Sequence, residues 1–230
     1  MKRLYMPRLP SESVNTMPDR CAIPEVFESG WRLEEKVCIV APGPNGRGHY
    51  QEIPPGYRVI AVSKAALIPE IRASVWIMLH AHQDWYLEAS ASFKGIRIYG
   101  DAAARVAESE LLALGCECYC FYPPPDALSP EVRPVDGFIR IGGSVSGCAL
   151  QIAYNFGASD ILLCGVDMSG DGYFDGTMNV ERTHGDTWGV VKNLNPLIRW
   201  MMEKRGLRIH TLSPTRLDVP FLGKAAGHTP

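Results

Sequence analysis

Short, uninterrupted apolar runs recur along the chain, and segments long enough for helices separate them. Such runs are typical of strands buried on both faces, as in a parallel sheet covered by helices. We expect strands over 37–41, 58–62, 74–79, 95–99, 116–122, 160–166 and 207–212. The pattern predicts an α/β fold: a single Rossmann-like domain in which a mostly parallel, twisted sheet carries helices on both faces.

The length of 230 residues suits one domain of this kind, which we place at 36–214. Before it, four prolines among polar residues indicate an irregular N-terminal arm over 1–35. After it, residues 215–230 are expected to form a C-terminal tail. The prediction is therefore one folded unit with two extensions.

Two helices and one long loop complete the predicted organisation. Helical composition extends over 144–156, and Gly157 follows as a residue suited to end a helix. A second helix is expected over 194–204. The polar, glycine-rich segment 168–192 is longer than an ordinary connection, which favours a functional loop or lid.

Charge and composition exclude several partners. Lysine and arginine total 23 against 25 acidic residues, without a long basic run, so we expect no nucleic-acid partner. No apolar stretch approaches the roughly 20 residues that a membrane span needs. The basic first residues lack a following signal-peptide core, so we expect a cytoplasmic protein. Its seven cysteines should be reduced, because several lie in apolar runs: Cys38, Cys118, Cys148 and Cys164.

The first candidate site is the glycine-rich loop after the first predicted strand. Glycines allow a backbone to approach a phosphate closely. The order is G-x-x-G-x-G over 43–48, whereas a dinucleotide site has G-x-G-x-x-G, and Ser63 stands where an acid would bind ribose. An anion-binding loop and a turn without a ligand both remain open. The candidate residues are Gly43, Pro44, Asn45 and Gly46.

The second candidate is the segment 142–147, directly before a predicted helix. Ser144 or Ser146 is suited to cap that helix, and its first-turn N–H groups and positive dipole end favour a phosphate. Plain capping explains the serines equally well. Gly143 belongs to the same candidate site.

The third candidate follows the strand over 160–166. Asp167 stands at the carboxyl end, where a carboxylate binds Mg²⁺, a sugar hydroxyl or the protein's own loop. With Asp171 and Asp175 it forms an alternative metal site. Later in the loop, His184 is suited to act as a general base, and a surface histidine without function is the other interpretation.

Two further patterns suggest metal chemistry. His80 and His82 are two residues apart after the third predicted strand, with Asp84 nearby, as in some metal hydrolases. Three cysteines lie at alternate positions over 116–120. The histidine pair needs ligands from distant loops, so metal hydrolysis stays an alternative. For the cysteines, strand alternation explains the spacing, and tightly spaced structural metal sites without a second cluster are rare.

The order of these motifs resembles that of a group of related transferases. The stretch from Gly142 to Asp167, GGSVSGCALQIAYNFGASDILLCGVD, resembles a hallmark segment of the glycosyltransferase family 42 sialyltransferases. Flagellin glycosyltransferases and MptE-like 6-hydroxymethylpterin diphosphokinases share that segment. The likeness includes 41–44, 173–177 and 207–214, and it covers most of residues 36–214.

The resemblance implies roles for several residues. In the sialyltransferases the glycine-rich loop and the serine-bearing helix start hold a CMP-sugar, which here corresponds to Gly43, Ser144 and Ser146. A histidine in the late loop is their base, and His184 matches it by order. Those enzymes carry asparagines after the first three strands, where this chain has Pro42, Ser63 and His80.

These patterns lead to a ranked set of hypotheses. The leading one is a glycosyltransferase with a nucleotide-sugar donor, a small or glycan acceptor and no required cofactor. The alternatives are Mg²⁺-dependent pyrophosphoryl transfer from ATP and a catalytically idle binding module. Such enzymes are commonly homo-oligomers, although no motif defines an interface. Catalysis is assigned to His184, Asp167 and Arg182, and binding also to Ser63, His80, Tyr173 and Asp175.

Overall fold

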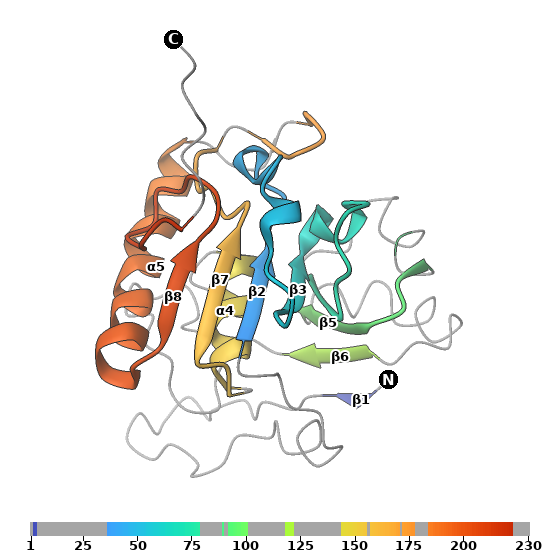
Figure 1. Ribbon diagram of the computed structural model, residues 1–230, viewed down its shortest axis with the longest axis horizontal. Coiled ribbons are helices and arrows are strands. Elements are labelled where there is room, and N and C mark those ends of the chain that lie inside the picture. The colour runs from blue at the N-terminus through green and yellow to red at the C-terminus, as the bar shows by residue number, and fades with distance from the viewer. Residues whose placement is uncertain are drawn as a thin grey trace, which may run out of the picture.

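A single parallel sheet organises the protein (Figure 1). The computed structural model describes residues 2–3, 36–78, 89, 92–100, 118–121, 144–155, 157–170, 172–177 and 184–222. Within these residues eight strands lie in the order β1-β6-β5-β4-β3-β2-β7-β8, and every neighbouring pair is parallel. This arrangement confirms the predicted α/β fold class. The strands are β1 Lys2–Arg3, β2 Lys36–Val40, β3 Arg58–Val62, β4 Val75–Met78, β5 Ile96–Gly100, β6 Cys118–Phe121, β7 Asp160–Cys164 and β8 Arg208–Thr211.

The two predicted extensions both contribute to the sheet. Within the arm, Lys2–Arg3 forms β1 beside β6, while residues 4–35 lie outside the described part. At the other end, Phe221 forms a parallel bridge with Thr211. Neither pairing was predicted, because the partner of β1 lies far away in sequence and segments of one or two paired residues show no periodicity.

Helix α5, His184–Arg205, begins at His184 and not at Leu194, so the predicted loop 168–192 is shorter. Glycines and polar residues in its first turns suggested a loop. An apolar stripe nevertheless starts at Val190 and repeats at helical spacing, and it is buried against the sheet.

Helix α4, Val145–Asn155, follows the prediction closely. Gly157 comes after it with φ +89°, as a residue that ends a helix in the left-handed conformation. Side chains of α4 and α5 share one core cluster with one face of the sheet. In the described part, the 3₁₀ helices η2 Tyr50–Glu52 and η3 Ser63–Leu67 and adjoining loops pack against the other face, and η1 Pro44–Gly46 follows β2.

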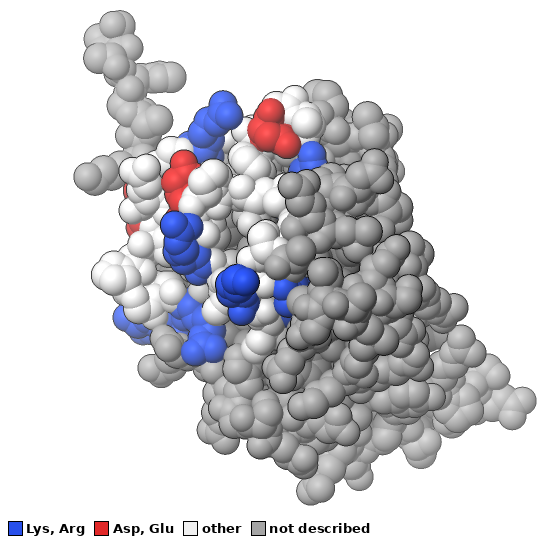
Figure 2. All heavy atoms as spheres, turned by 90° about the vertical axis from the view of Figure 1, so that its right-hand side faces the viewer, with Lys and Arg blue, Asp and Glu red and all other residues white. Residues whose placement is uncertain are grey.

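Two general features agree with the composition. None of the helices in the described part has the length and apolarity of a membrane span. On the face shown in Figure 2, basic side chains of the described residues lie among neutral residues and a few acids.

Three of the predicted core cysteines are free thiols in the interior: Cys38, Cys148 and Cys164. Burial raises the pKa of all three, and it raises that of Cys164 to about 12, with a smaller contribution from the charge of Asp167. Thiols with such pKa values hold almost no thiolate at neutral pH. The side chain of Cys118 and the cysteine cluster over 116–120 lie outside what the structure describes.

We expect these thiols to resist modification in the folded protein. With a thiol reagent at pH 8, at most four of the seven cysteines should react rapidly, and all seven should react in denaturant. Mass spectrometry of the modified peptides identifies the protected sites. Rapid labelling of Cys38 or Cys148 in the native protein would contradict the described packing.

Candidate functional site

A pocket lies where the strand order reverses. From β2 the chain continues through β3, β4, β5 and β6 on one side, then returns to place β7 and β8 on the other. Ligands in open α/β sheets bind at the carboxyl ends of the strands at such a switch point. In Figure 1 the arrowheads of β2, β7 and β8 point to the end of the sheet where the segments after β2 and β7 lie.

Four separate segments line this pocket, whose volume is about 240 Å³. They are 41–44 after β2, 62–63 at the end of β3, 144–146 at the start of α4, and 165–173 after β7 without the undescribed position 171. The volume is slightly below the roughly 300–1,000 Å³ of typical ligand pockets. Sequence-predicted segments that are far apart along the chain thus meet at one place.

The loop after β2 makes close backbone contact with the end of β7. The N–H of Gly43 donates to the carbonyl of Gly165 at 2.9 Å. A Cβ on Gly43 would lie 2.3 Å from that oxygen and 2.5 Å from Cγ of Asp167. Packing against β7 therefore requires glycine at position 43. This requirement accounts for one glycine of the predicted phosphate-binding loop even if no phosphate binds there.

Asp167 lines the pocket and is hydrogen-bonded to the loop after β2 and to the segment after β8. Its side chain is only 4% exposed, and its Oδ2 accepts the N–H of Asn45 at 2.6 Å. Its main-chain carbonyl accepts the N–H of Arg216 at 3.0 Å. Of the three partners that the sequence suggested for this carboxylate, the protein's own loop is the one that the structure shows.

Asn45 and Gly46 lie behind the pocket wall, not on it. The Asn45 side chain is exposed and donates to the carbonyl of Pro214 at 3.2 Å. Gly46 is buried, and a Cβ there would lie 2.7 Å from the Tyr50 hydroxyl. These two predicted binding residues support the loop, while Gly43 and Pro44 line the pocket.

The start of α4 opens into the pocket. Oγ of Ser144 accepts the N–H of Ser146 at 3.2 Å, and the Ser144 carbonyl accepts the N–H of Gly147 at 3.0 Å. The capping role predicted for Ser144 is therefore confirmed. Both serines are about 5% exposed and line the pocket together with Val145. The positive end of the helix dipole thus faces a space that a small ligand can fill.

Two residues that line the pocket have strained backbones. Ser63 and Met168, after β3 and β7, have φ values of +48° and +54°, the left-handed region that residues other than glycine rarely adopt. Each costs about 1–3 kcal/mol and persists only where the surroundings enforce it. For Ser63, Trp76 Nε1 donates to its carbonyl at 2.8 Å. Strain of this kind is concentrated at functional sites.

The loop 172–177 is closed by its own polar groups. Oδ1 of Asp175 accepts the N–H of Thr177 at 3.0 Å and its hydroxyl at 2.6 Å, and the Phe174 N–H donates to the Pro42 carbonyl at 2.7 Å. Lys64 donates to Asp175 Oδ2 at 3.3 Å. Tyr173 lines the pocket, whereas Asp175 lies outside its wall and holds the loop together.

Asp175 gives this loop a defined pH dependence. Burial raises the pKa of its carboxyl, but hydrogen bonds from Thr177 and the charge of Lys64 outweigh burial and hold the pKa below the ordinary value of 3.8. Because the folded pKa is the lower one, this stabilisation is present above the unfolded pKa and is lost as the pH falls through the folded pKa. Urea unfolding should show Asp175→Asn less stable than the wild type at pH 7. The two proteins should converge at pH values below the folded pKa, and a constant difference at all pH values would contradict this role.

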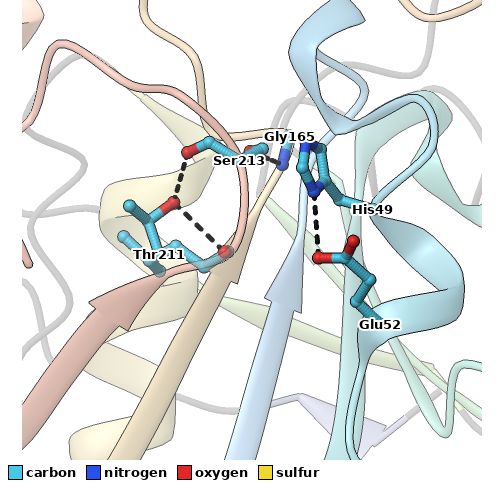
Figure 3. A network of polar contacts seen from close by, with 6 residues as sticks. His49, Glu52, Gly165, Thr211 and Ser213 are labelled. Atoms are coloured by element: carbon cyan, nitrogen blue, oxygen red, sulfur yellow. Dashed lines mark hydrogen bonds and ion pairs between the residues drawn. The ribbon is translucent and has the colours of Figure 1, made fainter. Parts of the chain in front are cut away.

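The segment after β8 supports the pocket from behind (Figure 3). The Gly165 N–H donates to Oγ of Ser213 at 2.8 Å, and Oγ1 of Thr211 donates to the Ser213 carbonyl at 2.7 Å. In the same view, Nδ1 of His49 lies 3.1 Å from Oε2 of Glu52. Neither the contact of His49 with Glu52 nor the support by Ser213 was predicted from the sequence.

Several predicted residues cannot be placed at the pocket. His80, Gly143, Asp171 and Arg182 lie outside the described residues, and His184 is described by its backbone alone, as the first residue of α5. His82 and Asp84 also lie outside them. Among the described residues, no three His, Cys, Asp or Glu side chains form a group able to hold a metal.

Sequence reasoning missed Lys64 and Trp76 as supports of the site. Lys64 directly follows Ser63, the residue that departs from the dinucleotide motif. A lysine directly after a strand end, together with the later Asp-Gly-Thr turn at 175–177, is the signal that was present. Its partner could not be known without the sheet order.

No family model matches the sequence, and no curated protein matches it. Comparison with solved structures finds the sialyltransferase CstII from Campylobacter jejuni in complex with a substrate analogue, cytidine-5'-monophosphate, at 10% identity and a TM-score of 0.47. That match covers 83% of this chain and 86% of the other. A structure of CST-II with a trisaccharide acceptor and CMP matches at 10% identity, a TM-score of 0.46, and 83% and 89% coverage. The monofunctional α-2,3-sialyltransferase Cst-I from Campylobacter jejuni matches at 14% identity, a TM-score of 0.41, and 82% and 85% coverage. These structural neighbours are sialyltransferases, the enzymes that the sequence motifs resemble.

Proposed function

We propose that this chain is a nucleotide-dependent glycosyltransferase that uses a CMP-activated sugar and transfers it to a hydroxyl group. The observation that carries the proposal is the pocket at the switch point, which combines the start of α4 with the segments after β2, β3 and β7. The sequence motifs that resemble the sialyltransferases supply three of these four segments.

The pocket offers separate places for the two polar parts of such a donor. The start of α4 at 144–146 suits the phosphate, because backbone N–H groups and the positive dipole end favour an anion there. The buried carboxylate of Asp167 disfavours a phosphate beside it and suits hydroxyl groups, which donate to it. A donor with one phosphate and several hydroxyls fits this distribution of charge.

The reaction needs a base and a place for the leaving group. The acceptor hydroxyl forms a bond to the anomeric carbon of the sugar, the bond from that carbon to the phosphate oxygen breaks, and CMP leaves with the electron pair. We assign the proton of the acceptor hydroxyl to His184, and the charge on the leaving phosphate to the start of α4 and to Arg182. This scheme consumes no cofactor.

Ligand-dependent thermal unfolding tests the proposal. CMP at about 100 times its dissociation constant adds about 2.7 kcal/mol of stability, which for a chain of this size raises Tm by about 5–10 °C. We expect this shift with CMP or CDP, and we expect it to persist in EDTA. A shift with ATP and Mg²⁺ alone, or none with any nucleotide, would contradict the proposal.

A further inference from the structure

Lys64 joins the end of β3 to the loop after β7. Its side chain is only 14% exposed, and its Nζ donates to Oδ2 of Asp175 at 3.3 Å and to Oγ1 of Thr177 at 3.0 Å. The same ammonium lies 5.2 Å from the centroid of the Tyr173 ring, over its face. The three contacts go to residues of a single loop, 172–177.

Hydrogen bonds within the loop 172–177 connect its residues, so a contact that holds one of them also restrains the others. Tyr173 donates its N–H to the Thr177 carbonyl at 2.9 Å, and Gly176 donates to the Tyr173 carbonyl at 3.0 Å. The two carboxylate oxygens of Asp175 have different partners. Oδ1 accepts hydrogen bonds from Thr177 within the turn, and Oδ2 accepts one from Lys64. Within this loop, Gly172 and Tyr173 line the pocket.

The backbone from which Lys64 extends is held by a hydrogen bond to a buried residue of β4. Ser63, the residue before Lys64, has the left-handed φ of +48° and lines the pocket. Its carbonyl accepts the indole N–H of Trp76, which is 0% exposed. Lys64 therefore extends from a backbone that buried β4 holds in place.

We propose that Lys64 is a positioning residue that fixes Tyr173 as a wall of the pocket and so sets the affinity of the site for its ligand. It acts through Asp175 and the tyrosine ring, and it does not itself line the pocket. The identity of the ligand, CMP, rests on the proposed function. The connection between Lys64 and the loop is independent of that function.

A double-mutant cycle on CMP affinity tests the route of action. Lys64→Met and Asp175→Asn should each raise the Kd of CMP about 10-fold in calorimetry, and the double variant should be no weaker than the weaker single variant. Lys64→Arg should restore most of the affinity, because an arginine keeps the ion pair with the carboxylate. Lys192→Met, on the exposed side of α5, is the matched control and should bind as the wild type does. If Lys64→Met weakens binding while Asp175→Asn leaves or improves it, Lys64 contacts the ligand directly and the positioning role is wrong.

A second measurement needs no ligand. Chymotrypsin cleaves after aromatic residues, and the bond after Phe174 lies in the loop that Lys64 holds. Mass spectrometry should show that cleavage of this bond is about 10-fold faster in Lys64→Met than in Lys192→Met, while the midpoint of urea unfolding of Lys64→Met falls no further than that of Asp175→Asn. Faster cleavage in a protein that fails to bind CMP would support the connection and contradict the proposed function. An unchanged cleavage rate would overturn the positioning role whatever the protein binds.

Discussion

The His184→Ala variant is expected to turn over about 10²–10⁴-fold more slowly than the wild type and to bind CMP with unchanged affinity. This is the usual contribution of a general base, and alanine removes the group that we propose as the acceptor of the hydroxyl proton. Helix α5 begins at His184, and Tyr173, earlier in the connection from β7, lines the pocket. Steady-state rates at saturating donor, together with the Kd of CMP, check both halves of the prediction.

The control for this variant is another histidine on a regular element. His210 is half-buried on β8 and does not line the pocket, so His210→Gln should keep both turnover and affinity. Turnover in His184→Ala equal to that of the wild type would remove His184 from the base role. A loss of CMP affinity equal to the loss of turnover would make it a binding residue.

The Gly43→Ala variant is expected to lose at least about 10-fold in CMP affinity and about 1–3 kcal/mol in stability, as overpacked sites do. A methyl group at this position would lie 2.3 Å from the Gly165 carbonyl and 2.5 Å from Cγ of Asp167. The loop after β2 must then move away from β7, which opens the pocket on one side. Urea unfolding and calorimetry with CMP measure the two effects.

Gly48→Ala is the matched control for the loop. Gly48 has φ +89°, and a Cβ there would meet nothing within 4 Å. Alanine at 48 therefore costs about 1–2 kcal/mol of backbone strain without a clash, and CMP affinity should stay as it is. Equal losses of affinity in the two variants would show that general loosening of the loop, and not the packing of Gly43, controls binding.

The strands of the sheet could be predicted because each of them has a pattern within its own short stretch of sequence. Each central strand is an unbroken apolar run, as at Ile161–Cys164, and such runs are buried on both faces in the structure. The start of α4 was predicted for the same reason, since a serine before a helical segment is a local capping signal. Predicted binding residues that line the pocket, such as Gly43, Ser63 and Ser144, follow strands or precede a helix directly.

The parts that were missed depend on contacts between distant residues. Lys64 meets Asp175 across 111 positions, and Gly165 meets Ser213 across 48. The start of α5 was missed because Gly185 and Gly189 suggest a loop until the stripe from Val190 is known to face the sheet. These pairs form because of the order of the strands in the sheet. The spacing of the residues along the sequence does not predict them.

The release of CMP from a CMP-sugar, followed in EDTA with and without a glycan acceptor, tests the central claim most directly. The account predicts that CMP appears at a rate that rises with the acceptor, in step with a glycosylated product, and that the rate falls about 10²–10⁴-fold in His184→Ala. A protein that binds CMP in the pocket but releases none from any CMP-sugar would contradict the transferase and leave a binding module in its place.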